Sequence, residues 1–129
     1  MSPAKKPRIF VADDDPDILK IVVSNLRSEG FDVEAFPDGY QAEVAARRAH
    51  PDLMVLDVVM PAKTGLDVLA SLRANPETAD IPVVLLTARS SDAEVWEGWK
   101  AGAAYYITKP FQVEELLQFV KSLFASRTA

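Results

Sequence analysis

The sequence of 129 residues contains no cysteine, one histidine and only five glycines. Without cysteine the chain forms neither disulfide bonds nor thiolate metal sites, and one histidine supports neither a zinc site nor a histidine-based relay. No glycine-rich phosphate loop follows any apolar segment, so nucleotide binding of that kind is not expected. Any chemistry must therefore use carboxylates, hydroxyl groups and lysines.

The chain also lacks long apolar runs and an excess of basic residues. No run approaches the roughly 20 apolar residues that span a bilayer. The N-terminal segment Met1–Arg8 lacks the apolar stretch that a secretory signal contains. Nineteen acidic and fourteen basic residues give a net charge of -5, the wrong sign for neutralising phosphates. We therefore expect a cytoplasmic protein that contacts no membrane and binds no nucleic acid directly.

Short apolar segments alternate with amphipathic helical segments along the chain. The expected strands are Ile9–Ala12, Phe31–Ala35, Leu53–Leu56, Ile81–Leu86 and Ala104–Ile107. Each gap between them holds one helix and two short loops, as parallel βαβ units require, and a last helix is expected from Gln112 to Ala125. The pattern predicts one α/β domain over residues 8–125, between disordered tails at 1–7 and 126–129.

Polar residues follow four of the five expected strands. They are the acidic run Asp13, Asp14 and Asp15, then Asp57, Thr87 with Ala88, and Thr108 with Lys109. In an open α/β sheet, ligands bind beyond the carboxyl ends of the strands, so we expect these residues to share one site. Asp15, followed by Pro16, is also a good helix cap.

Several carboxylates at one edge of a sheet repel each other unless a cation neutralises them. Carboxylate oxygens without nitrogen or sulfur ligands favour Mg²⁺, or alternatively Mn²⁺. A divalent cation, a lysine ammonium and a threonine hydroxyl together can receive the oxygens of a phosphoryl group. The sequence therefore predicts a metal-assisted phosphoryl site.

Four motifs carry a resemblance to a known family. Val11–Pro16, Leu56–Pro61 with Gly65, Leu85–Ala88 and Tyr106–Phe111 resemble, in order and spacing, the conserved segments of the receiver domain of two-component response regulators. The resemblance covers Arg8 to Phe124. It implies a flavodoxin-like (βα)5 fold whose five parallel strands lie in the order 2-1-3-4-5.

The resemblance also implies roles for individual residues. Asp57 would accept a phosphoryl group from a sensor histidine kinase or a phosphotransfer protein, so the domain is a phosphoacceptor and not an enzyme that acts on other substrates. Asp14, Asp57 and the backbone carbonyl of Val59 would bind Mg²⁺, and Asp13 would act through a metal-bound water. The phosphoryl oxygens would meet the Lys109 ammonium, the Thr87 hydroxyl and the Ala88 backbone N–H.

By the same resemblance, Thr87 would move toward the phosphoryl group and Tyr106 would turn inward. This movement would switch the face formed by the helix that begins at Ser91, the strand 104–107 and the helix 112–125, through which a partner or an output domain is controlled. The Lys109–Pro110 peptide bond is expected to be cis. Neither Val59 nor Arg89 can orient an attacking water, so slow loss of the phosphoryl group is expected.

Three expectations concern partners and alternatives. Trp96 and Trp99, three residues apart, suggest a partner or homodimer surface. An Mg²⁺-dependent phosphatase would need a second acid at Val59, so the remaining alternative is an interaction module that is not phosphorylated. The receiver segment leaves no room for an output domain, so output is expected through another protein or through a domain that this chain lacks.

Overall fold

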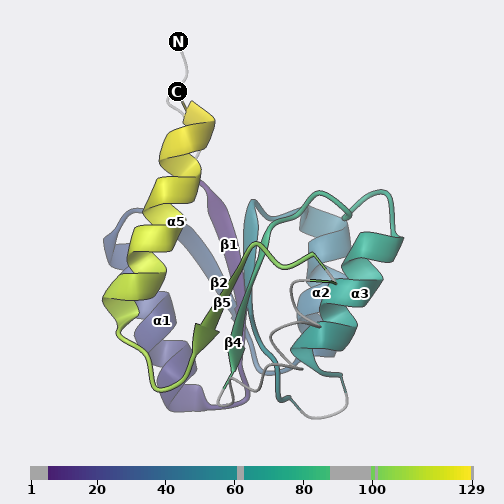
Figure 1. The fold of residues 1–129 in the computed structure, drawn as a ribbon, viewed down its shortest axis with the longest axis horizontal. Helices are drawn as coiled ribbons and strands as arrows, with labels where there is room; N and C mark the ends of the chain where they lie inside the picture. Colours follow the sequence, from purple (N-terminus) through teal and green to yellow (C-terminus); the bar gives the residue numbers. More distant parts are fainter. Residues whose placement is uncertain (1–5, 61–62, 88–99, 101, 129) are drawn as a thin grey trace.

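The computed structural model describes residues 6–60, 63–87, 100 and 102–128 (Figure 1). Strands and helices alternate over residues 8–87, and the helix expected from Ser91 lies outside the described residues. The strands are β1 (Arg8–Ala12), β2 (Asp32–Phe36), β3 (Leu53–Asp57), β4 (Val83–Thr87) and β5 (Tyr105–Thr108). The helices are α1 (Pro16–Ser28), α2 (Gly39–Ala49), α3 (Gly65–Ala74) and α5 (Val113–Thr128).

All neighbouring strands are parallel, and the sheet order is β2-β1-β3-β4-β5, which confirms the expected fold. Helices α1 and α5 lie on one side of the sheet, and α2 and α3 lie on the other (Figure 1). Because every strand runs in the same direction, all five carboxyl ends meet at one edge.

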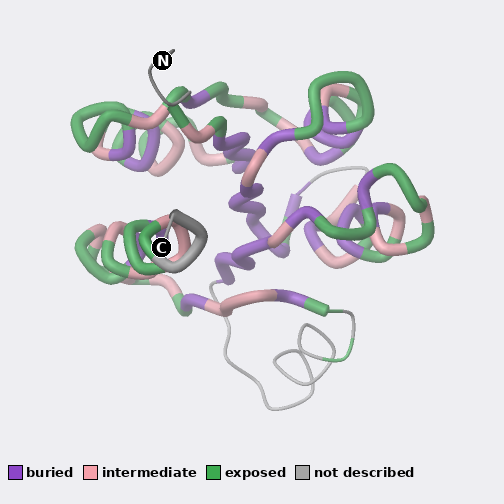
Figure 2. Tube along the Cα trace, turned by 90° about the horizontal axis from the view of Figure 1, so that it is seen from above, coloured by how far each residue is buried: buried purple, intermediate pink, exposed green. Residues whose placement is uncertain are grey.

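The core consists of two hydrophobic clusters, one on each face of the sheet. Side chains alternate between the faces of a strand, so in β1 Ile9 and Val11 pack toward α1 and α5, whereas Phe10 and Ala12 pack toward α2 and α3. The central strands are buried on both faces, which explains why they are continuous apolar runs (Figure 2).

Local signals set the helix ends. The Asp15 carboxylate accepts hydrogen bonds from the backbone N–H groups of Asp17 and Ile18, which confirms its assignment as the cap of α1. Thr64 and Asp67 form a capping box at the start of α3. His50 ends α2 in the left-handed conformation, with φ of 47°.

Two segments near the ends of the domain extend beyond the expected elements. Helix α5 continues to Thr128, past the expected helix end at Ala125, because no glycine or proline interrupts the helix. At the other end, the carbonyl of Pro7 accepts a hydrogen bond from Asp32 N–H and already belongs to the sheet edge. The domain limits themselves remain a prediction.

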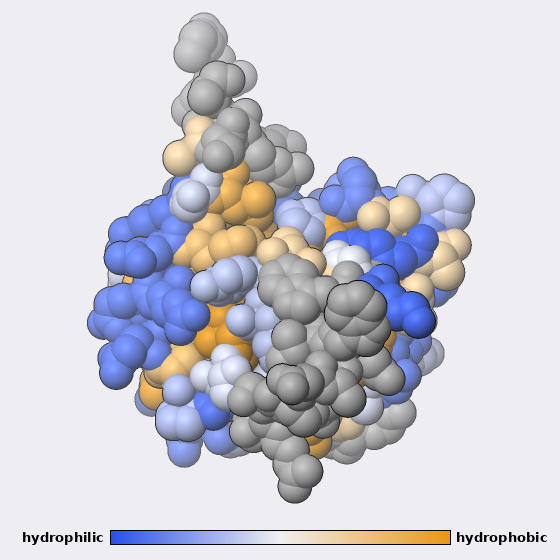
Figure 3. Space-filling view, in the orientation of Figure 1, coloured by the Kyte–Doolittle hydropathy of each residue, from blue (hydrophilic) through white to orange (hydrophobic). Residues whose placement is uncertain are grey.

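Helix α5 covers the edge strand β5. The rings of Tyr105 and Phe119 stack with centroids 4.6 Å apart, and hydrophobic residues gather between α5 and the middle of the view in Figure 3. The Tyr105 hydroxyl donates a 3.3 Å hydrogen bond to the Glu115 carboxylate, so Tyr105 packs at the edge of the sheet with its polar end outward. Among the described residues, no helix is both long and apolar enough to cross a membrane.

Candidate functional site

The site lies where the carboxyl ends of β1, β3, β4 and β5 meet. Asp57 and Thr87 are the last residues of β3 and β4, Asp13 follows β1, and Lys109 follows β5. The strand register places Asp57 beside Leu86 and Thr87 beside Thr108, so the predicted polar residues are brought to the same edge. This follows from the parallel order of the strands.

Three carboxylates form a tight cluster at this edge. Each of Asp13, Asp14 and Asp57 has a carboxylate oxygen within 4.8 Å of the oxygens of the other two. Asp13 and Asp57 are buried, whereas Asp14 is exposed, so the cluster opens to solvent on one side. Asp13 Oδ1 accepts a hydrogen bond of 2.9 Å from the backbone N–H of Asp15.

The buried carboxylate of Asp57 is held in an unfavourable environment. Burial, and then the negative charge of Asp13, raise its pKa to about 7, although the Lys109 ammonium and the Val59 N–H act in the opposite direction. The free energy of the ionised site is therefore lowered by any further cation that enters it.

Lys109 lies between the two buried carboxylates. Its Nζ is 2.9 Å from Asp13 Oδ2 and 3.3 Å from Asp57 Oδ2. Burial alone would lower the pKa of Lys109, but the hydrogen bond with Asp13 and the charges of Asp13 and Asp57 outweigh it and raise the pKa. Lys109 thus pairs with both carboxylates, the closer pair with Asp13 was not predicted, and the expected cis bond between Lys109 and Pro110 is confirmed.

The loop after β3 approaches Asp57 through its backbone. The N–H of Val59 donates a 3.2 Å hydrogen bond to Asp57 Oδ1, and the N–H of Gly65 donates one of 3.0 Å to the carbonyl of Val58. A Cβ at Gly65 would collide with the carbonyl oxygen of Asp57, so only glycine fits there. The Val59 side chain itself points to solvent and is 63% exposed.

Thr87 and Tyr106 lie on the same face of the sheet. Thr87 is two residues beyond Leu85, which faces the cluster between the sheet and helices α2 and α3, and the partly buried Tyr106 packs against that same cluster. The backbone carbonyl of Thr87 accepts a hydrogen bond from Lys109 N–H. The remaining candidates Ala88, Trp96 and Trp99 lie outside the described residues.

The donor set fits a hard divalent cation. Three carboxylates oppose one ammonium, all donors are oxygens, and two of the carboxylates are buried. This combination favours Mg²⁺ or Mn²⁺ over metals that prefer nitrogen or sulfur.

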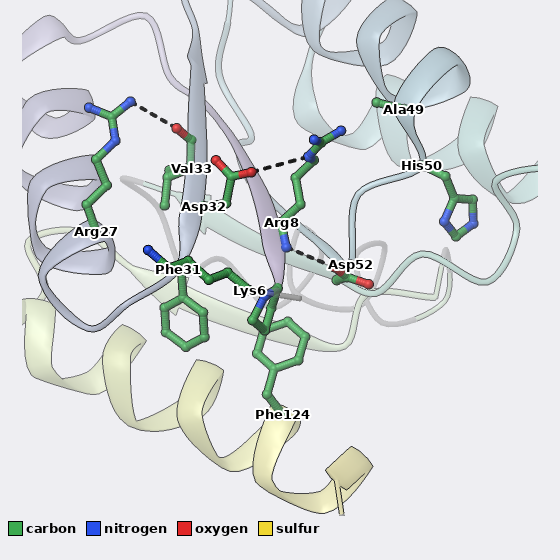
Figure 4. Close-up of a pocket in the computed structure, with 11 residues that line it drawn as sticks. Lys6, Arg8, Arg27, Phe31, Asp32, Val33, Ala49, His50, Asp52 and Phe124 are labelled. Carbon is green, nitrogen blue, oxygen red and sulfur yellow. Dashed lines mark hydrogen bonds and ion pairs between the residues drawn. The ribbon is translucent and has the colours of Figure 1, made fainter. Parts of the chain in front are cut away.

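Two cavities lie outside this site, one at the opposite edge of the sheet and one beside Lys109. An open cavity of about 950 Å³ lies at the amino ends of β1 and β2, where Arg8, Arg27, Phe31 and Phe124 line it, and it contains none of the predicted site residues (Figure 4). A smaller one of about 350 Å³ adjoins Lys109 between α1 and the segment after β5.

Lys63, two residues before α3, is not solvated as a lysine outside helices and strands usually is. Its Nζ forms an ion pair with the buried Glu43 of α2, and the Lys63 side chain is only 27% exposed. One signal could have revealed the pair: Gly39, Ala42, Glu43 and Ala46 follow the spacing of a buried helix face, which places Glu43 inward.

The fold and the site define a class of protein: a doubly wound α/β domain with an acidic, lysine-containing site at the carboxyl edge of its sheet. The sequence model of one protein family, the response regulator receiver domain, matches residues 9–121 of this chain. The chain therefore belongs to this family. Phosphorylation and Mg²⁺ binding at an acidic pocket are typical of the family. Its receiver domains are generally not conventional enzymes.

Two curated relatives are similar over most of this chain. The DNA-binding dual master transcriptional regulator RpaA of Synechocystis is 43% identical over 117 residues, which are 91% of this chain and 48% of that protein. The DNA-binding response regulator MtrA of Mycolicibacterium smegmatis is 40% identical over the same share of this chain and 50% of its own length. The chain therefore spans about half the length of these relatives.

Two solved receiver domains share the fold. That of a Francisella response regulator has a TM-score of 0.87 and 33% identity, and the match covers 96% of this chain and 100% of the other. That of a sensor histidine kinase from Pseudomonas aeruginosa, described with a magnesium ion in its active site cleft, has a TM-score of 0.83 and 27% identity, over 92% and 97% of the two chains.

The comparisons correct one expectation. The net charge led us to exclude a nucleic-acid partner, and this exclusion is wrong, because both curated relatives are named as DNA-binding regulators. The net charge of these residues bears only on their own direct contacts with nucleic acid.

Proposed function

We propose that Asp57 accepts a phosphoryl group from a phosphohistidine of a sensor histidine kinase or phosphotransfer protein. An Asp57 carboxylate oxygen attacks the phosphorus, a P–O bond forms as the donor's P–N bond breaks, and the product is an aspartyl phosphate. The observation that carries the proposal is the position of Asp57: a buried carboxylate that clusters with Asp13 and Asp14 and contacts the Lys109 ammonium.

The residues around Asp57 are suited to hold the reacting group. Lys109 already contacts both buried carboxylates, so its ammonium can pair with a phosphoryl oxygen after transfer. The Thr87 hydroxyl, at the end of β4, would bind a second phosphoryl oxygen, and the Ala88 N–H would bind a third.

The carboxylates of Asp14 and Asp57 and the carbonyl of Val59 would hold Mg²⁺, or Mn²⁺, with Asp13 acting through a bound water. When bound, the ion neutralises negative charge on the carboxylates and on the phosphoryl oxygens. The high pKa of Asp57 supports this assignment, because the ionised carboxylate gains most from such a partner.

The proposed output is a shift between two packings around β5. Thr87 and Tyr106 share a face of the sheet, so a movement of Thr87 toward the phosphoryl group opens space into which Tyr106 can settle. We propose that this shift controls DNA binding by an output domain, as the names of the curated relatives suggest. Mobility shifts of DNA by the full-length native gene product, with and without a phosphodonor, test this part.

The phosphorylation step is tested by intact-mass spectrometry after incubation with acetyl phosphate and Mg²⁺. We expect a gain of one phosphoryl group, which Asp57→Asn or a chelator abolishes. Asp67→Asn is the matched control, since Asp67 is an exposed capping residue of α3, and it should gain the group as the wild type does. An unmodified wild type that also fails to bind beryllofluoride would contradict the proposal and favour a non-phosphorylated interaction module.

A further inference from the structure

A buried ion pair joins helix α2 to the loop that follows the phosphoacceptor. Lys63 Nζ contacts Glu43 Oε1, and Arg47 Nη2 lies 2.9 Å from Glu43 Oε2. The Glu43 side chain is 9% exposed and that of Lys63 27%, whereas Arg47, with 48%, reaches solvent. Glu43 therefore has one partner on its own helix and one on a different element.

Such a pair contributes little to the net stability of a domain. Removing two charges from water costs more than burying apolar side chains of similar volume, so a buried ion pair is weak support for a role in stability alone. It does fix geometry, because the buried Glu43 carboxylate keeps only the half-exposed Arg47 as a cationic partner when Lys63 is lost. The feature that this pair fixes is the position of Lys63 relative to α2.

The backbone of Lys63 is held by the same face of α2. A Cβ at Gly39 would lie 2.7 Å from the Lys63 carbonyl oxygen and 3.2 Å from Met60 Cε, so the loop packs directly on the first turn of the helix. Gly39 and Glu43 are four residues apart, hence adjacent on one helix face. Helix α2 thus contacts both the backbone and the side chain of Lys63.

The loop held in this way begins at the phosphoryl site. Val59 donates its N–H to Asp57 Oδ1, and the N–H of Val58 donates to the carbonyl of Leu86 at 2.7 Å. At the other end of the loop, Gly65 approaches the Asp57 carbonyl. The Val59 side chain is exposed, whereas Val58 and Met60 on either side of it are buried in the cluster next to α2 and α3, so contacts of the loop with α2 add to those that hold the Val59 backbone.

We propose that Glu43 and Lys63 are positioning residues for the metal and phosphoryl site. Their ion pair holds Lys63 against α2 and so helps to keep the Val59 backbone directed toward the site. This positioning preorganises the site for Mg²⁺. The inference rests on the proposed function, since it concerns how tightly that same site binds the ion.

The test is the Mg²⁺ dissociation constant, measured by calorimetry on the full chain without a phosphodonor. Lys63→Met and Glu43→Gln are each expected to weaken Mg²⁺ binding about tenfold, as loss of residues that orient metal ligands does. For Lys63→Met, the direction of the change in Mg²⁺ affinity is diagnostic. Removal of a positive charge would by itself strengthen Mg²⁺ binding, so weaker binding indicates lost positioning. The double variant should be no weaker than the worse single variant.

Two variants separate positioning from general damage. Arg47→Gln removes the other partner of Glu43, which lies on α2 and is half exposed, so Mg²⁺ affinity should stay within about twofold of wild type. Lys63→Arg retains the cation and should restore affinity. In metal-free protein, the Val59 amide resonance should shift in Lys63→Met and not in Arg47→Gln.

Unchanged or tighter Mg²⁺ binding by folded Lys63→Met would overturn the inference, and so would equal losses in Lys63→Met and Arg47→Gln. Thermal unfolding confirms that each variant is folded at the assay temperature. A wild type that binds no Mg²⁺ and gains no phosphoryl group would instead overturn the proposed function. The two failures are therefore distinguishable.

Discussion

The Asp57→Asn substitution should stabilise the metal-free protein, and the gain should depend on pH. In the folded protein the pKa of Asp57 is raised from 3.8 to about 7, so the folded state holds the proton more tightly than the unfolded state. The stability associated with this proton is fully present below about pH 4 and is lost as the pH rises through about 7. Asparagine carries no charge and avoids this loss.

The size of the effect follows from the shift in pKa. About three pKa units at about 1.4 kcal/mol each give a ceiling of about 4 kcal/mol at pH 8, falling to about 2 kcal/mol at pH 5. The contribution of other titrating groups cancels when the variant is compared with wild type under the same conditions. Urea unfolding in the presence of a chelator, at several pH values, measures the difference.

Two results bear on this reasoning. Parallel stability profiles of wild type and Asp57→Asn, or a variant less stable than wild type at about pH 8, would refute it. Mg²⁺ provides an internal check, because an ion that binds only the folded state should stabilise wild type by about 3 kcal/mol at one hundred times its dissociation constant. Asp57→Asn should gain much less.

Three further predictions concern the same edge of the sheet. Lys109→Met leaves the Asp13 and Asp57 carboxylates without their ammonium, so the metal-free protein should lose about 3 kcal/mol in urea unfolding, and Mg²⁺ should recover part of it. Gly65→Ala places a Cβ against the Asp57 carbonyl and should cost about 1–3 kcal/mol in the same assay; a neutral result would contradict the close approach. Since Val59 cannot orient an attacking water, the phosphoryl group should persist for minutes or longer in purified protein, and a half-life of seconds, followed by intact mass, would be inconsistent with this prediction.

The fold was predictable because its signals are local. Apolar runs such as Leu53–Leu56 are bounded by polar residues, and the change from strand to helix period at Asp15 and Pro16 is visible in the sequence. Parallel strands then place Asp57 and Thr87 at one edge without further information. The order of the strands came from the family resemblance, because alternation alone allows several orders.

Contacts between distant side chains were not predictable in the same way. The closer pairing of Lys109 with Asp13, 96 residues away, depends on distances across the sheet edge. The Glu43 and Lys63 pair likewise requires knowledge of how α2 packs on the loop. The extension of α5 to Thr128 escaped prediction because no glycine or proline near Ala125 marks where the helix ends.

The central claim is that Asp57 carries the phosphoryl group, and mapping the modified residue tests it most directly. Acyl phosphates are reduced by borohydride, so treatment of the phosphorylated chain followed by peptide mass spectrometry marks the modified aspartate as homoserine. We predict conversion of Asp57 in the presence of Mg²⁺, with Asp13 and Asp14 unchanged. Conversion of a different aspartate, or none in protein whose intact mass shows the phosphoryl group, would contradict the account.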